Sequence, residues 1–372
     1  MSSRLPHAID RYGPPVLRLV GALGTVLLVL FAVRLLGTAT AAAAPSLERV
    51  LREVVVGDVS ALGLGWLGAY VLANGSVVAA LGLSLSNAGL LSPSELFLTV
   101  AGSRLGGAAV VVFIGALDWF GKRRQALRES VSMGLLAFLL THSIYLPATV
   151  LGYAALPALL GRFIGVGGGW TVGFDSTWVV EAVALAVTAR IGPTASILLA
   201  VAVLFGSLKL FDRLLEAVDT ETLRRRFFGR LENTWLSFVA GVFVTGVTTS
   251  VAFSLGVIVP LYNRGYIRRE ELIPYVLGAN IGTLFDTIVV AVVLESPVGL
   301  VVVLELLAAA TLVTLVVLLA EGTYSQLVSA ADERLLEDRR AFVAFVLSLL
   351  LVPLALVAVP LASVLAFLSR AG

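Results

Sequence analysis

Long apolar runs separated by short polar connections make up most of the chain. Most of these runs reach 18 residues, about the length that an α-helix needs to cross the hydrocarbon core of a bilayer. The runs are continuous and do not alternate, so they predict membrane helices and not a β-barrel. The predicted apolar segments are 16–36, 59–88, 93–120, 131–154, 174–190, 193–211, 234–262, 271–294, 298–320 and 342–369.

Two of the segments, 59–88 and 234–262, are broken near their middle by small polar residues. A break in hydrocarbon leaves backbone groups without partners, at a cost of several kcal/mol each, unless they line a wet cavity. We therefore expect two re-entrant hairpins rather than two straight spans. The polar connections 216–232 and 321–341 are expected to form short amphipathic helices at the membrane surface.

Composition agrees with an integral membrane protein, because 59% of the residues are hydrophobic and only 13% are charged. The chain has no Cys and only two His, which excludes disulfides, thiolate chemistry and a His-rich metal centre. No nucleophile is coupled to a base in the sequence, so we expect no enzyme and no cofactor. The net charge of +2 points to no nucleic-acid partner, and the expected location is the cell membrane.

The chain contains an internal repeat with an offset of 176 residues. Residues 65–106 align without a gap on residues 241–282, and four of the identical positions are glycines. Each half thus predicts a scaffold helix, a broken hairpin and a helix interrupted by a Gly-flanked polar turn. Interrupted helices in corresponding halves point to the binding site of a secondary transporter. The identical positions of the first half are 65, 71, 85, 87, 89, 95, 96, 100, 102 and 106.

Arginine clusters between the apolar runs predict the topology. The clusters at 122–128, 213–230 and 264–269 are expected on the cytoplasmic side. The first hairpin then opens outward and the second inward, which is an inverted repeat. Because an even number of spans must separate the first two clusters, the path of 155–192 stays open at this point.

These patterns predict an all-α polytopic membrane protein built from two inverted repeats. The expected divisions are a cytoplasmic segment 1–15, a first repeat 16–154, a connecting membrane segment 155–192, a second repeat 193–320, and an interfacial segment with a final helix over 321–372.

The second repeat resembles the sodium/phosphate cotransporter family. That family carries a G-x-x-x-T-x-x-x-Q-S-S-S stretch followed by a Pro and L-G-A-N-I-G-T, and here Gly241, Thr245, Pro274 and Leu277 to Thr283 fall on this pattern. In the first half, residues 61–120 share the resemblance only through the internal repeat. The resemblance implies sodium and phosphate as the transported species, with the two Q-S-S-S tips as their contacts.

The chain departs from this pattern at both tips. Thr249-Ser250-Val251-Ala252 and Ala73-Asn74-Gly75-Ser76 replace Q-S-S-S, and Arg104 replaces the Asn of the first G-A-N-I-G-T. These changes affect the expected substrate more than the expected fold.

The candidate substrate-binding residues lie where an outgoing helix would begin, because free N–H groups at a helix start attract anions. Plain helix capping is the alternative. Arg104 joins this set, since its planar guanidinium fits a tetrahedral oxyanion. The candidates are Asn74, Gly75, Ser76, Arg104, Thr248, Thr249 and Ser250.

Three residues are candidate ligands for a sodium ion. Asn280 and Thr283 offer side-chain oxygens in the predicted unwound turn, and Asp286 adds an anionic oxygen one turn later. An ion pair between Asp286 and Arg104 is the alternative, because a charge within the membrane needs a partner or a cavity. Glu181 and Glu305 are further ionisable residues inside apolar runs.

The expected function is sodium-coupled import of inorganic phosphate or a similar small oxyanion by alternating access. The alternatives are a cation-coupled carrier of another small anion and a membrane scaffold or regulator without flux. The expected partners are the anion, sodium and the lipid bilayer, with a homo-oligomer also open.

Overall fold

The computed structural model describes residues 15–121, 125–165, 178–216, 233–251, 254–255, 258 and 269–371, and the described part contains helices and turns but no strand. The helices are α1 (Pro15–Val54), α2 (Asp58–Leu72), α3 (Gly75–Asn87), α4 (Pro93–Gly121), α5 (Gln125–Gly165), α6 (Trp178–Ile191), α7 (Pro193–Glu216), α9 (Thr234–Thr248), α11 (Arg269–Gly282), α12 (Leu284–Val293), α13 (Pro297–Leu319), α14 (Glu321–Glu337) and α15 (Arg339–Ala371).

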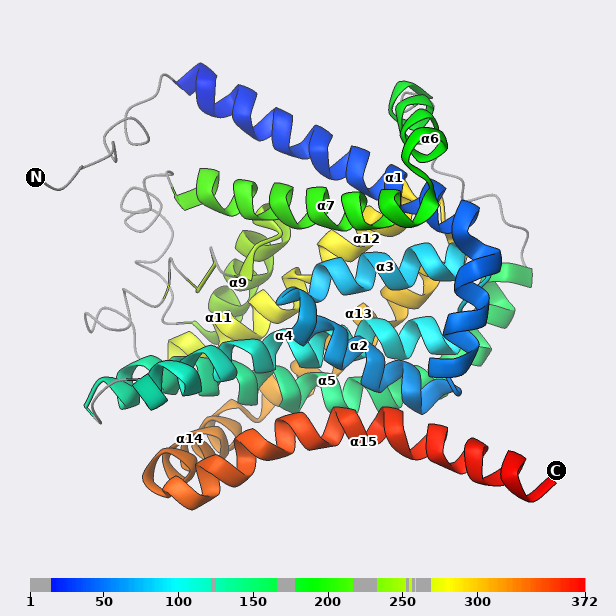
Figure 1. Cartoon of the computed structure of the whole chain (residues 1–372). Helices are drawn as coiled ribbons and strands as arrows, with labels where there is room; N and C mark the ends of the chain where they lie inside the picture. The colour runs from blue at the N-terminus through cyan, green and yellow to red at the C-terminus, as the bar shows by residue number, and fades with distance from the viewer. Residues whose placement is uncertain are drawn as a thin grey trace, which may run out of the picture.

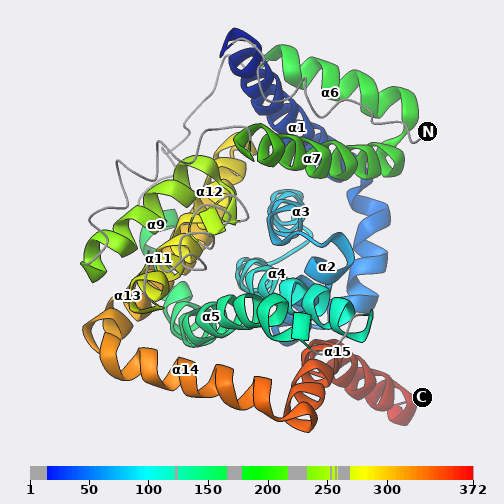
Figure 2. The same ribbon diagram turned by 90° about the vertical axis from the view of Figure 1, so that its left-hand side faces the viewer.

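The short helix α3 lies at the centre of the molecule, and longer helices surround it (Figures 1 and 2). It packs against α1, α2, α4, α7, α12 and α13. Its buried residues lie between Val77 and Ser84 and are all small or aliphatic, which allows neighbours to approach from every side. Helices from the two halves of the sequence therefore meet around one short central helix.

Seven of the described helices are long and apolar enough to cross a membrane. Together they make this a multi-pass membrane protein. Between the arginine clusters at 122–128 and 213–230 lie two such spans, at 132–163 and 193–215, which gives the even number that the charge pattern requires. The helix α6 has only 14 residues and does not qualify, so 174–190 is not a full span within the described residues.

Within the described residues the predicted apolar segments correspond to helices, with longer bounds in several places, and parts of 174–190 and 234–262 lie outside the described residues. α1 continues from the predicted 16–36 to Val54, and α5 extends from 131–154 to 125–165. α14 covers most of the predicted amphipathic segment 321–341. Its position at a membrane surface stays a prediction, and the segment 216–232 falls outside the described residues except for Glu216, the last residue of α7.

The predicted interruption at the Gly-rich motif is wrong for α4, whereas in the second half α11 ends at Gly282 and α12 begins at Leu284, so the helix is divided there at Thr283 without unwinding. α4 runs unbroken through residues 102–107, and α11 passes directly into α12 with Thr283 still in the right-handed helical region. The Thr283 amide also donates to the Ala279 carbonyl, which continues the helical hydrogen-bond ladder. The glycines have another purpose, which is close packing between helix backbones.

Three glycine contacts of the first half recur in the second half at the same offset of 176 residues. A Cβ on Gly65, Gly102 or Gly106 would lie within 3 Å of a backbone carbonyl on the facing helix of the α2–α4 pair. The equivalent contact recurs at Gly241, Gly278 and Gly282 in the α9–α11 pair. Such small-residue contacts let membrane helices approach closely. The inverted orientation of the two halves stays a prediction.

The two broken segments also turn in the same way. α2 ends in a left-handed residue at Ala73, with φ of 48°, and α9 ends in one at Thr249, with φ of 50°. These residues are again 176 apart, and neither is a glycine, although the left-handed region disfavours side chains. α2 and α3 have 15 and 13 residues, fewer than the roughly 20 that a span needs. The re-entrant path that this suggests stays a prediction.

The turn between α12 and α13 ties the second half to the first. Arg34 of α1 forms an ion pair of 2.6 Å with Glu295 in this turn. Asn87, at the end of α3, donates from its side-chain nitrogen to the Leu294 carbonyl at 3.1 Å. Asn87 is thus an interhelical contact and does not cap its own helix.

Candidate functional site

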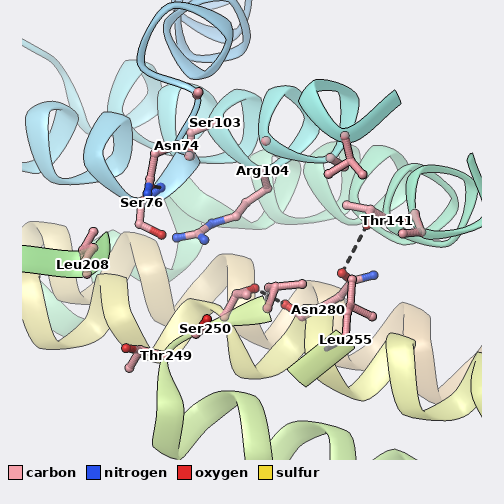
Figure 3. A pocket seen from close by; sticks show the side chains of 18 of the residues that line it. Asn74, Ser76, Ser103, Arg104, Thr141, Leu208, Thr249, Ser250, Leu255 and Asn280 are labelled. Carbon is pink, nitrogen blue, oxygen red and sulfur yellow. Dashed lines mark hydrogen bonds between the residues drawn. The ribbon is translucent and has the colours of Figure 1, made fainter. Parts of the chain in front are cut away.

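A cavity of about 310 Å³ lies between the two halves, where both hairpin turns meet α4, α5, α7 and α11. Figure 3 shows Arg104 extending from α4 into the gap, with Ser76 beside it and Ser250 and Asn280 on the opposite wall. Most of the predicted site residues therefore converge on one space. Those that line it are Asn74, Gly75, Ser76, Arg104, Thr249, Ser250, Asn280 and Thr283.

The first turn of α3 is capped by its own sequence. The Asn74 Oδ1 atom accepts hydrogen bonds from the backbone amides of Ser76, at 2.9 Å, and Val77, at 3.1 Å. The expectation of free N–H groups for an anion is therefore wrong at these two positions, because an Asn at an N-cap satisfies them internally. Asn74 still presents its amide nitrogen, and Ser76 its hydroxyl, among the groups that line the cavity.

Gly75 sits at the closest approach between α3 and α4. A Cβ at this position would lie 2.5 Å from the Ser103 carbonyl oxygen. Only glycine permits this distance, and the contact holds the hairpin turn against the helix that carries Arg104. Gly75 therefore positions neighbouring groups and has no side chain to offer a ligand.

Arg104 is buried, with 7% of its side chain exposed, and it is paired across the two halves. Its Nη2 donates to Asp286 Oδ1 at 3.1 Å and also to the Thr287 hydroxyl. The Nε atom has no hydrogen-bond partner among the described residues. Because Arg104 also lines the cavity, its buried guanidinium can still take an anionic ligand there.

The polar groups of α11 that line the cavity are hydrogen-bonded directly to α5. The Thr141 hydroxyl donates to Asn280 Oδ1 at 3.1 Å, and the Tyr145 hydroxyl donates to the Asn280 carbonyl at 2.8 Å. The Thr283 hydroxyl donates to the same carbonyl at 2.6 Å. The Asn280 Nδ2 is buried and has no hydrogen-bond partner among the described residues.

Two predicted residues do not line the cavity. The Thr248 side chain donates back to the Val244 carbonyl within α9 and is buried there. Asp286 lies on the far side of its ion pair with Arg104 and lines a different cavity. The three candidate sodium ligands are therefore not gathered around one point, although Asn280 and Thr283 share the first cavity.

Sequence reasoning missed the contributions of α5 and α7. Thr141 and Tyr145 stand one turn apart on the face of α5 that lines the cavity. Asp212 lines it from the last turns of α7, which continues to Glu216 instead of ending at 211. A polar pair spaced by four residues inside the apolar run 131–154 was a usable signal for the first two. Asp212 offered no such signal, because the predicted segment 193–211 ended before it.

The other ionisable residues of the apolar runs lie elsewhere. Glu181 is exposed in the first turn of α6, so it faces neither a cavity nor a partner among the described residues. Glu305 is buried in the middle of α13 and lines neither cavity. His142 stacks on Phe138, with 3.6 Å between the ring centroids, and packs within the helix bundle.

Comparison with known proteins finds one family model that is similar to part of the second half of the chain. The family model described as Na+/Pi-cotransporter matches residues 202–330, from α7 to α14. No curated protein and no solved structure matches the chain. The match includes the turn at Thr249 and α11 with Thr283, which form one wall of the cavity. Residues 202–330 thus establish a relationship between this chain and the Na+/Pi-cotransporter family.

Proposed function

We propose that the chain is a sodium-coupled secondary transporter that imports inorganic phosphate, or a similar small oxyanion, by alternating access. The observation that carries this proposal is the buried Arg104 guanidinium, which reaches from the first half into a cavity formed with the second half. The match of residues 202–330 to a cotransporter family supports the transporter class.

The chemistry of the cavity suits a small tetrahedral anion. Arg104 supplies a positive charge, and Ser76 and Thr249 add hydroxyl groups from the two turns. A guanidinium binds oxyanions through parallel N–H donors, and this bond is stronger where water is excluded. Arg104 thereby replaces donors that the family's Gln residues would provide at the tips.

The ion pair suggests how anion and cation binding are coupled. In the empty state Arg104 and Asp286 neutralise each other, at 3.1 Å. An anion on Arg104 alone would leave Asp286 as an uncompensated buried charge, at a cost of about 3–5 kcal/mol. A sodium ion on Asp286 removes this cost, and the anion likewise removes the cost of an unpaired Arg104. Each ligand therefore favours binding of the other, as linkage requires.

The position of the site between the two halves supports the proposal of alternating access. The cavity is bounded by both hairpin turns, so a movement of one half against the other would change the side from which it is reached. We propose that Asn280 and Thr283 complete the sodium site with Asp286 once Arg104 has turned toward the anion. The same buried polar groups argue against a scaffold without flux, because such groups are costly to keep in a membrane.

Uptake of labelled phosphate into proteoliposomes tests the proposal. An inward sodium gradient should drive accumulation, and replacement of sodium by choline should abolish it. Arsenate should compete with phosphate, because it has the same shape and charge. Competition by sulfate alone would assign the carrier to another oxyanion, and no uptake of any oxyanion under a sodium gradient would contradict the proposal.

A further inference from the structure

A second cavity, of about 210 Å³, lies on the other side of the Arg104–Asp286 pair. It is enclosed by α1, α3, α7, α9 and α12, and its walls are mostly aliphatic. The motif analysis does not account for this second cavity. The proposed transport cycle uses only one of its lining residues, Asp286. Its lining residues on α1 are Thr25, Val26, Val29, Leu30 and Val33, and those on α12 are Asp286, Val289, Val290 and Val293.

The mouth of this second cavity faces outward between α1, α9 and α12. Val26, Val247 and Val289 line the cavity and are 47%, 65% and 47% exposed. They lie on helices whose outer surfaces are aliphatic, as the lipid-facing surface of a membrane protein is. The cavity is therefore reached sideways, from the hydrocarbon of the bilayer.

The inner end of the second cavity carries a carboxylate with an unused oxygen. The Asp286 side chain is only 9% exposed. Its Oδ1 accepts hydrogen bonds from both Arg104 and Thr287. Its Oδ2 accepts none from the described residues, so this buried oxygen is available to a ligand in the cavity. A buried carboxylate oxygen with unused acceptor capacity favours a cationic donor.

The two cavities lie against opposite members of the Arg104–Asp286 ion pair. Ser76, Leu208, Phe211 and Thr249 line both spaces, whereas Arg104 lines only the first and Asp286 only the second. The first cavity therefore presents a cation, and the second presents an anion at the end of an apolar passage. Ligands of opposite charge are expected on the two sides.

We propose that the second cavity is a binding site for a lipophilic monovalent amine that enters from the bilayer. The ammonium group donates to Asp286 Oδ2, and the aliphatic chain lies along the valines and leucines and leaves through the mouth. A fatty acid is excluded, because its carboxylate would meet Asp286, while a neutral chain gains only the apolar contacts. This inference does not depend on phosphate transport, since binding alone defines the site.

Binding of labelled octylammonium to the protein in lipid nanodiscs, with empty nanodiscs as the background, tests the site. 1-Octanol and octanoate match the chain length with a neutral and an anionic head. Unlabelled octylammonium should displace the saturable component, and octanol should do so at least about tenfold more weakly, or about 1.4 kcal/mol. Equal displacement by octanol would overturn the proposal in favour of an uncharged acyl chain.

Three variants are expected to change octylammonium binding in different directions, one of them upward. General destabilisation of the protein could only weaken binding. Asp286→Asn should weaken octylammonium binding at least about tenfold. Arg104→Gln should strengthen it, because the carboxylate loses its internal cation. Val29→Trp should reduce it by filling the cavity from α1. A weaker site in Arg104→Gln, or an unchanged one in Val29→Trp, would overturn the assignment.

Glu305→Gln is the matched control. Glu305 is also a buried carboxylate on a membrane helix, but it lines neither cavity. Octylammonium binding should be unchanged in this variant. Loss of octylammonium binding in Glu305→Gln would show that the amine binds to Glu305 and not to Asp286, and it would overturn the proposed site.

Discussion

At the scale of single residues, the account depends on a few polar groups whose partners can be named. Asp286 gives one prediction. Replacing it by Asn keeps the shape and an oxygen for Arg104 but removes the charge proposed to hold sodium. The sodium concentration for half-maximal phosphate uptake should therefore rise about tenfold, a change of about 1.4 kcal/mol.

The control for Asp286→Asn is Glu305→Gln, measured in the same proteoliposomes. Glu305 is buried, yet it lies outside both cavities, so its sodium dependence should match that of the unaltered protein. An unchanged sodium dependence in Asp286→Asn at normal expression would assign Asp286 to structure alone.

Asn74 gives a second prediction, because its oxygen and nitrogen have separate tasks. Asn74→Asp keeps the oxygen that caps α3, so thermal stability should stay close to that of the unaltered protein. It also places a negative charge at the cavity, so phosphate uptake should be lost. Asn74→Ala should instead cost about 1 kcal/mol of stability through loss of the cap.

These two readouts separate capping from ligand binding at Asn74. Thermal unfolding in detergent measures the cap, and uptake at matched protein density measures the ligand role. Normal uptake by Asn74→Asp would show that the residue only caps its helix.

At the scale of elements, the apolar runs predicted the helices well because length and continuity of hydrophobic residues decide membrane insertion. Both hairpin breaks were also predictable, from small polar residues such as Asn74 and Thr249. The interruption predicted in α4 was wrong, because a glycine motif such as residues 102–107 has two physical uses. It can unwind a helix or let another helix approach, and the sequence of one helix does not contain its neighbour.

The close packing at these glycines gives a third prediction. Gly278→Ala places a Cβ within 3 Å of the Phe238 carbonyl, so the α9–α11 pair must separate. Such overpacking costs about 1–3 kcal/mol and should lower the unfolding temperature measured by thermal size-exclusion chromatography. Gly161→Ala, on α5, meets nothing within 4 Å and should not lower it. Equal stability of the two variants would contradict the packing role.

At the scale of the whole molecule, the site could be only partly predicted. Arg104, Asn280 and Thr283 were found because their motif repeats and resembles a family pattern. The spacing of Thr141 and Tyr145 was a usable signal on α5, but the contribution of Asp212 depends on how α7 crosses the two halves, and no local pattern carries that information. Likewise, Asp286 lines the second cavity because of the way in which α12 is oriented relative to α1, and the sequence of α12 alone does not contain that orientation.

Topology gives a fourth prediction. If the arginine clusters are cytoplasmic, then Gln125→Cys at the start of α5 and Glu216→Cys at the end of α7 should both resist an impermeant thiol reagent in intact cells. Ser92→Cys, exposed before the start of α4, should react. The chain has no Cys of its own, so the background is low.

The two protected sites decide between orientations of the halves. Both should react after the membrane is permeabilised. Labelling of Glu216→Cys but not of Gln125→Cys in intact cells would make the repeats parallel and would contradict alternating access by inversion.

The central claim, that Arg104 holds the transported anion, is tested most directly by phosphate uptake of Arg104 variants in proteoliposomes at matched protein density. Arg104→Ala should abolish sodium-driven uptake, and Arg104→Lys should retain uptake with a higher half-saturation concentration, because charge remains but the guanidinium fork is lost. If Arg104→Ala proves poorly stable, the Arg104→Ala/Asp286→Ala double variant removes both buried charges and should fold without transporting phosphate. Uptake by Arg104→Ala with the half-saturation concentration of the unaltered protein would contradict the account.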